Sequence, residues 1–213
     1  PMRHTTPLAC GLALGLLAAL AGCGRSDPSA GQTAAAGKAP MIFRVGNGSE
    51  VQDLDPQTVT GVPEHKIIMA LFEGLVTEHP EDLSPMPGLA ESWTISDDGL
   101  VYTFHLRANL RWSNGDPITA GEIVESFRRI LSPSLASEYA YLVYNFVAGA
   151  RDYYEGRLTD FAQVGFRAPD DRTFVVTLNH PTPYLLRIMA SHYSWWPVPT
   201  HIIARYGPLD RKR

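Results

Sequence analysis

The sequence contains little cysteine and no strongly basic segment. Its 213 residues include only Cys10 and Cys23, and Cys10 lies in an apolar N-terminal segment that we expect to be removed. The mature chain is therefore expected to have no internal disulfide. The formal net charge is −4, and Lys and Arg form no run before the last three residues. Nucleic acid is therefore excluded as a partner.

Catalytic motifs are also missing. The chain has no G-x-S-x-G nucleophile elbow and no G-x-x-x-x-G-K-[ST] phosphate loop. Gly46-x-Gly48 is followed by Val51 where a dinucleotide fingerprint requires a third glycine. The seven histidines include no i, i+4 pair and no H-E-x-x-H, which excludes zinc hydrolysis by that route. The sequence thus indicates a protein that is not an enzyme and needs no metal or other cofactor.

The first 22 residues have the order of an export signal. Basic Arg3 precedes an apolar run over 8–21, and Gly22 then leads directly into Cys23. At 14 residues the run is shorter than the roughly 20 that a membrane-spanning helix needs. A cysteine after small residues resembles a bacterial lipobox, in which the thiol is lipidated. We therefore predict a lipoprotein signal peptide over 1–22, lipidation at Cys23, and a periplasmic or extracytoplasmic location with a lipid anchor to a membrane. The alternative is an ordinary secretory signal with a chance cysteine.

Two regions follow the signal. Residues 23–40 are dominated by small and polar residues with few bulky apolar ones, which predicts a flexible spacer. The chain as a whole is 45% hydrophobic and 10% aromatic, as is typical of a folded globular protein. We therefore predict that the folded part occupies residues 41–213.

The apolar pattern along the folded part predicts helices and strands without a regular βαβ rhythm. This mixture indicates an α+β or irregular α/β fold. Thr119 and Glu122 have the spacing of a helix capping box, and Asp98-Gly99 separates two alternating segments as a hairpin turn does. The predicted elements are a strand over 41–45, a helix that buries Ile67, Ile68, Leu71, Phe72 and Leu75 and ends near Gly74, a hairpin over 93–106, a helix from Thr119 to Pro133, a helical segment over 139–150, a strand over 173–178, and helices over 184–190 and 199–206.

Several short blocks, in order along the chain, carry a resemblance to a known family. They look like the oligopeptide-binding protein family of ABC importers, which are large extracytoplasmic solute receptors. The similarity runs almost continuously from Gly46 to Gly207. The blocks are Gly48-Ser49-Glu50, Leu54-Asp55-Pro56, Gly61-Val62-Pro63-Glu64, Leu71-Phe72-Glu73-Gly74-Leu75, Pro87-Gly88-Leu89-Ala90-Glu91-Ser92-Trp93, Tyr102-Thr103-Phe104-His105-Leu106-Arg107, Trp112-Ser113-Asn114-Gly115-Asp116-Pro117-Ile118-Thr119-Ala120 and Pro197-Val198-Pro199.

The resemblance implies a non-enzymatic receptor that closes two lobes around an extended oligopeptide and delivers it to ABC permease subunits. A receptor that ignores peptide sequence must grip the backbone and the termini. Members of the family are much longer than this chain, so residues 41–213 are expected to be the N-terminal part of a two-lobe periplasmic binding protein fold, truncated before the second lobe. The alternatives are a receptor for a dipeptide, a nickel chelate or an oligosaccharide, and a truncated lipoprotein that takes no part in transport.

The resemblance also implies which loop meets the ligand. The family segment matching Gly61, Val62 and Pro63 brings its backbone to the peptide near its N-terminal end, with Val62 as the leading contact. Thr60 stands where relatives often have an acidic residue, so a charge pairing with a basic ligand side chain at this point is not implied.

Two aromatic residues are further implied as ligand contacts. His192 is the nearest equivalent of a cleft-lining histidine that precedes the Pro-Val-Pro segment. Tyr139 matches a tyrosine that faces the pocket. The alternative for each is a structural role: His192 as a hydrogen-bonded buried histidine, and Tyr139 as part of the core with Tyr141 and Tyr144, given their near-helical spacing.

Overall fold

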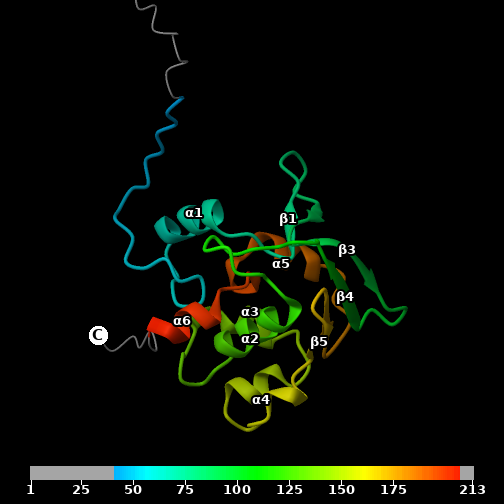
Figure 1. Cartoon of the computed structure of the whole chain (residues 1–213). Helices are drawn as coiled ribbons and strands as arrows, with labels where there is room; N and C mark the ends of the chain where they lie inside the picture. Colours follow the sequence, from blue (N-terminus) through cyan, green and yellow to red (C-terminus); the bar gives the residue numbers. More distant parts are fainter. Residues whose placement is uncertain (1–40, 207–213) are drawn as a thin grey trace, which may run out of the picture. The chain divides into compact units, whose positions relative to one another are not determined.

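The computed structural model describes residues 41–206 (Figure 1). The signal peptide predicted for 1–22, the spacer predicted for 23–40 and the lipidation site Cys23 lie outside these residues. None of the helices within 41–206 is both long and apolar enough to cross a membrane.

Residues 41–45, taken by themselves, form neither helix nor strand, so the strand predicted there is wrong. An apolar sequence becomes a strand only when its backbone pairs with a neighbour. None of the described strands is hydrogen-bonded to these five residues. Residues 46–206 belong to one unit, and the rest of the fold is described within it.

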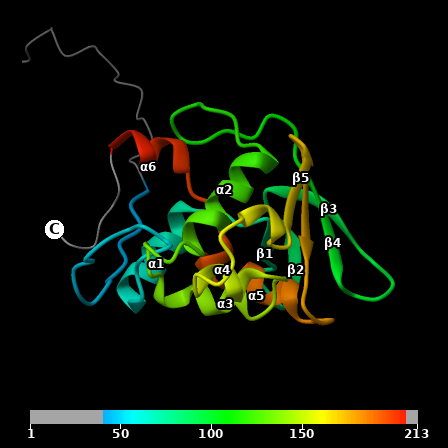
Figure 2. The same cartoon turned by 90° about the horizontal axis from the view of Figure 1, so that it is seen from below.

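An antiparallel four-stranded sheet in the order β3-β4-β6-β5 forms one side of this unit (Figures 1 and 2). Strand β3 (Ala90–Ile95) and strand β4 (Val101–Leu106) form the predicted hairpin. Gly99 adopts a positive φ of 70° in the turn between them. Strand β6 (Thr173–Thr177) pairs with β4, and β5 (Phe166–Asp170) pairs with β6. The predicted hairpin and the predicted strand near 173–178 are thus confirmed.

Helix α2 (Ala120–Ile130) covers the apolar face of this sheet and contacts β5 and β6. Its Phe127 ring stacks on Phe166 and Phe174, with centroid distances of 4.4 Å and 5.7 Å. The helix begins where the sequence predicts, because the Thr119 hydroxyl accepts a hydrogen bond from the Glu122 N–H at 3.2 Å. The core therefore lies between α2 and the sheet.

The remaining elements are short. Two of them, α5 and α6, confirm the helices predicted over 184–190 and 199–206. The full set of remaining elements is α1 (Val62–Leu71), β1 (Val76–Glu78) paired with β2 (Pro85–Pro87), η1 (Glu138–Ala140), α3 (Tyr141–Tyr144), α4 (Ala150–Tyr154), η2 (Phe161–Gln163), α5 (Leu185–Ser191), η3 (Tyr193–Trp195) and α6 (Thr200–Tyr206).

Two predicted helices differ from the structure. Helix α1 ends at Leu71, before Gly74, and it buries Ile68 but leaves Leu71 64% exposed. The segment 139–150 is not one helix but η1, α3 and the start of α4. It is interrupted because Val147 leaves the helical path to form a β-bridge with Leu178.

Candidate ligand-binding site

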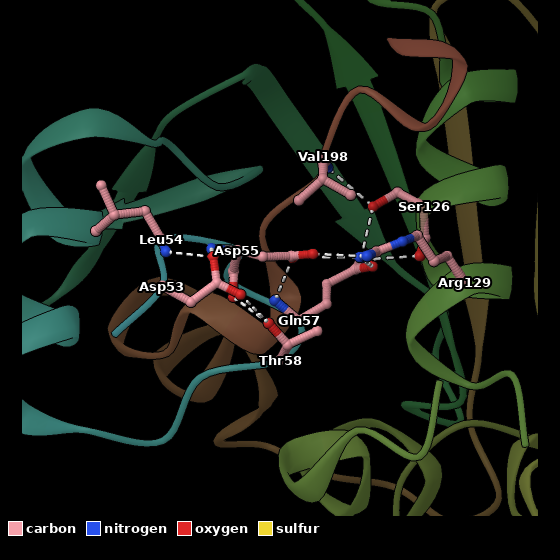
Figure 3. Close-up of polar contacts among 8 residues, drawn as sticks. All are labelled: Asp53, Leu54, Asp55, Gln57, Thr58, Ser126, Arg129 and Val198. Carbon is pink, nitrogen blue, oxygen red and sulfur yellow. Dashed lines mark hydrogen bonds and ion pairs between the residues drawn. The ribbon is translucent and has the colours of Figure 1, made fainter. Parts of the chain in front are cut away.

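A loop that we call the arm, residues 53–60, leads into helix α1 and is held by polar contacts. Asp53 folds the start of the arm around its own carboxylate. Its Oδ1 accepts from the N–H of Leu54 at 2.7 Å and of Asp55 at 3.2 Å, and its Oδ2 accepts from the Thr58 hydroxyl at 3.1 Å (Figure 3). These contacts form an Asx-type turn, which gives the arm a defined shape without helix or strand.

A buried ion pair joins the arm to helix α2. The Arg129 guanidinium donates to the two carboxylate oxygens of Asp55 at 2.6 Å and 3.2 Å, and to Gln57 Oε1 at 2.6 Å (Figure 3). The side chains of Arg129 and Asp55 are only 14% and 7% exposed. Such a bidentate pair fixes both distance and orientation. The arm is thus locked onto a helix that lies 74 positions later in the sequence.

Ser126 extends this network to a third segment. Gln57 Nε2 donates to the Ser126 carbonyl at 2.9 Å and to its hydroxyl oxygen at 3.0 Å (Figure 3). The same hydroxyl oxygen accepts from the Val198 N–H at 2.9 Å. Every buried polar side-chain atom within 41–206 has a hydrogen-bond partner. The arm, α2 and the Pro197–Pro199 segment therefore form one connected polar core.

Two tyrosines fix the end of the arm, next to Gly61. The Tyr193 hydroxyl donates to the Val59 carbonyl at 3.1 Å, and the Tyr139 hydroxyl donates to the Thr60 carbonyl at 3.2 Å. The Tyr139 ring meets His192 edge-on at 4.7 Å between centroids. The structure therefore brings Tyr139 and His192 together beside the loop that contains Gly61, as the sequence interpretation requires for a shared site.

Gly61 permits a close approach of the Glu64 side chain. A Cβ atom at this position would lie 1.8 Å from Glu64 Oε2. Glu64 is buried in the first turn of α1, where the helix dipole favours a carboxylate, and its Oε1 accepts from the Gln52 N–H at 3.0 Å. Glycine therefore lets the Glu64 carboxylate fold back over the loop and hold residue 52.

A polar cavity of about 720 Å³ opens beside the arm. Gly61 and Pro63 line it, whereas Val62 is 69% exposed next to it, and neither Tyr139 nor His192 belongs to its lining. The cavity lining is acidic, which the sequence interpretation did not predict. Glu138, adjacent to Tyr139, is the residue that could have indicated it. The lining consists of Ser49, Glu50, Gln52, Asp53, Thr58, Val59, Thr60, Gly61, Pro63, Glu64 and Glu138.

Burial sets the protonation of the aromatic cluster. It lowers the pKa of His192 to about 4, and nearby His65 adds to this effect. The neutral ring is required by its contacts, because His192 Nδ1 accepts from the Ser194 N–H at 3.1 Å. Burial also raises the pKa of Tyr193, followed by the effects of Tyr139 and Glu64, so its hydroxyl stays protonated as a donor.

A second cavity, of about 710 Å³, lies at the other end of α1 and is mainly apolar. It contains none of the predicted ligand contacts. Nearby, His201 pairs with Asp116 at 3.0 Å and with Glu122 at 2.8 Å. Within residues 41–206, no group of three or more His, Cys, Asp and Glu side chains has an arrangement that could hold a metal ion. The residues that line this second cavity include Leu71, Phe72, Leu89, Trp112, Ile118, Pro197, Pro199 and Ile202.

Residues 84–205 match the family model "Bacterial extracellular solute-binding proteins, family 5 Middle". The chain is 40% identical over 201 residues to the periplasmic oligopeptide-binding protein OppA of Salmonella typhimurium, covering 94% of this chain and 36% of the relative. It is 46% identical to Escherichia coli OppA, covering 76% and 29%. A crystal structure of Haemophilus influenzae OppA in complex with the peptide RPPGFSPFR matches with a TM-score of 0.71 and 40% identity, covering 76% of this chain and 31% of that one. The chain thus spans about a third of the length of these relatives.

Proposed function

Since this chain belongs to the bacterial extracellular solute-binding proteins of family 5, we propose that it supplies one wall of a non-enzymatic receptor that binds oligopeptides for an ABC importer. The family resemblance read from the sequence blocks is confirmed by the comparisons. The fold is also the predicted one, a mixed α and β part of a two-lobe periplasmic binding protein. The observation that carries the proposal is the convergence of Gly61, Tyr139 and His192 beside the polar cavity.

The backbone chemistry of the loop favours a peptide ligand. Within residues 41–206, no acceptor takes a hydrogen bond from the N–H groups of Thr60, Gly61 and Val62. Unpaired backbone donors suit the carbonyl groups of an extended peptide, which recur whatever its side chains are. The adjacent polar cavity suits side chains that are bound through water, because bridging waters replace contacts tailored to one residue type.

The proposal extends to location and partners. We place lipidation at Cys23, the chain on the extracytoplasmic side of a membrane, and ABC permease subunits as the partners that receive the peptide. A lipid anchor would hold the receptor near its permease and raise the effective concentration there. The relatives named periplasmic support the compartment. Transport by the whole receptor rests on the longer protein that these relatives represent.

Calorimetric titration tests the ligand class. A mixture of tri- to pentapeptides should bind saturably, and a dipeptide, a nickel chelate and an oligosaccharide should not. Saturable binding of one of the latter three, with none of peptides, contradicts the proposal.

Val62→Pro tests the role of the backbone donor. This change removes the Val62 N–H at the first position of α1, where proline is well tolerated, after a residue already in extended conformation (Gly61 φ −84°, ψ 151°). Peptide affinity should fall by about three- to tenfold, the range of one net hydrogen bond, with little change in melting temperature. Val62→Ala is the matched control, since it shortens the side chain and keeps the N–H. Equal affinities of the two variants would show that the donor is not used.

A further inference from the structure

Tyr193 contacts the segment 59–62, which we call the ligand loop, from the buried side. It was not predicted to contact a ligand. Its side chain is buried, with 1% exposure, in the short helix η3. Its ring centroid lies 5.5 Å from that of His65 and 4.5 Å from that of His192. The hydroxyl reaches across 134 positions of sequence to the Val59 carbonyl.

Three successive carbonyls of the loop are engaged by the protein itself. Val59 accepts from Tyr193, Thr60 accepts from Tyr139, and the Gly61 carbonyl accepts from the His65 N–H at 3.0 Å. In a planar trans peptide, the carbonyl of one residue and the N–H of the next point in opposite directions. Fixing these three carbonyls toward the protein therefore directs the N–H groups of residues 60, 61 and 62 the other way.

We propose that Tyr193 is a positioning residue for ligand binding: by holding the Val59 carbonyl, it sets the direction in which the Thr60 N–H is offered to a carbonyl of the bound peptide. This inference rests on the proposed peptide-binding function. Tyr139 acts in the same way on the Gly61 N–H, and the first turn of α1 acts on the Val62 N–H. The directions of these three donors are therefore set by the side chains of Tyr193 and Tyr139 and by the first turn of α1.

The test is Tyr193→Phe, which removes the hydroxyl and keeps the ring. Tyr102→Phe is the matched control, because the buried Tyr102 hydroxyl also donates to a backbone carbonyl, that of Thr182, at 3.0 Å, away from the loop. Backbone ¹⁵N relaxation of the chain without ligand reports the rigidity of each N–H. In the parent protein and in Tyr102→Phe, the Thr60 order parameter should be near the rigid value of about 0.85, and in Tyr193→Phe it should fall toward the flexible range below about 0.6.

Peptide affinity provides the second readout. Tyr193→Phe should weaken peptide binding by about three- to tenfold, whereas Tyr102→Phe should leave it unchanged. An unchanged order parameter at Thr60 in Tyr193→Phe, relative to the control, overturns the positioning role. If the parent protein binds no peptide, the proposed function fails, but the relaxation comparison still decides whether Tyr193 holds the loop. Tyr139→Phe, as a second variant, should loosen Gly61 and leave Thr60 rigid.

Discussion

The four-stranded sheet and the arm are neighbouring parts of one unit that are stabilised by opposite means. The sheet buries apolar side chains, such as Phe166 and Phe174, against Phe127 of α2. The arm buries polar groups instead, with Asp55 and Gln57 bound to Arg129. Apolar burial is non-directional and gives the fold most of its stability. Hydrogen bonds are directional, and buried ones are costly to leave unmade.

This difference separates stability from the definition of the site. An apolar core tolerates rearrangement as long as volume is preserved. A buried polar network defines a single arrangement, because every alternative leaves a charge or a donor without a partner. We therefore expect core changes to lower the free energy of unfolding, and arm changes to lower it less while altering the loop next to Gly61. The following predictions test this contrast in order of decreasing effect.

The largest effect is expected in the sheet. Phe104 is fully buried and contacts the rings of Trp93, Tyr102 and Phe174. Phe104→Ala leaves a cavity and should lower the free energy of unfolding by about 3–5 kcal/mol, measured by urea denaturation. Ile95→Ala, at a position 45% exposed on β3, is the control and should cost much less. Equal losses at the two sites would mean that this face of the sheet does not form the core.

Breaking the buried ion pair should have the next largest effect. Arg129→Met leaves the Asp55 carboxylate buried without its partner, so unfolding should become easier by about 3 kcal/mol. Arg128→Met is the matched control on the adjacent residue. Arg128 pairs with Glu125 at the surface, with side chains 50% and 46% exposed, and its loss should change stability by less than about 0.5 kcal/mol. Similar urea midpoints for the two variants would contradict the locking role of Arg129.

At neutral pH the smallest effect is expected at His192, because its contribution to stability changes only as the pH falls. Burial lowers the folded-state pKa of His192 to about 4, whereas an unfolded histidine titrates near 6.5. Between these values the unfolded state binds the extra proton, so stability is complete above about pH 6.5 and is lost progressively as the pH falls toward 4. His192→Asn retains an acceptor for the Ser194 N–H but does not titrate. The slope of stability against pH should therefore be shallower in this variant, and parallel curves would argue against a neutral His192.

Local sequence patterns predicted the elements that local contacts determine. The β3–β4 hairpin follows from alternation around Gly99, and the start of α2 follows from the Thr119 cap. The failures have long-range causes. The helix predicted over 139–150 is broken by the bridge from Val147 to Leu178, and the strand predicted over 41–45 has no pairing partner among the described residues.

The site was predictable only through the family resemblance. Neither spacing nor periodicity indicates that the Tyr193 hydroxyl meets the Val59 carbonyl, or that Arg129 meets Asp55, because 134 and 74 positions separate these partners. The resemblance directed attention to the Gly61–Pro63 loop, Tyr139 and His192, and the structure places them near one another. Their contact with a ligand remains a prediction.

The most direct measurement is an NMR titration of the ¹⁵N-labelled chain with a tripeptide. The central claim is that the unpaired N–H groups of residues 60–62 bind carbonyl groups of the peptide. Saturable shifts of the Thr60, Gly61 and Val62 amide signals, downfield as for new hydrogen bonds, are the predicted result. Shifts confined to the apolar cavity around Trp112 and Ile202, or no shifts at saturating peptide, would contradict the claim.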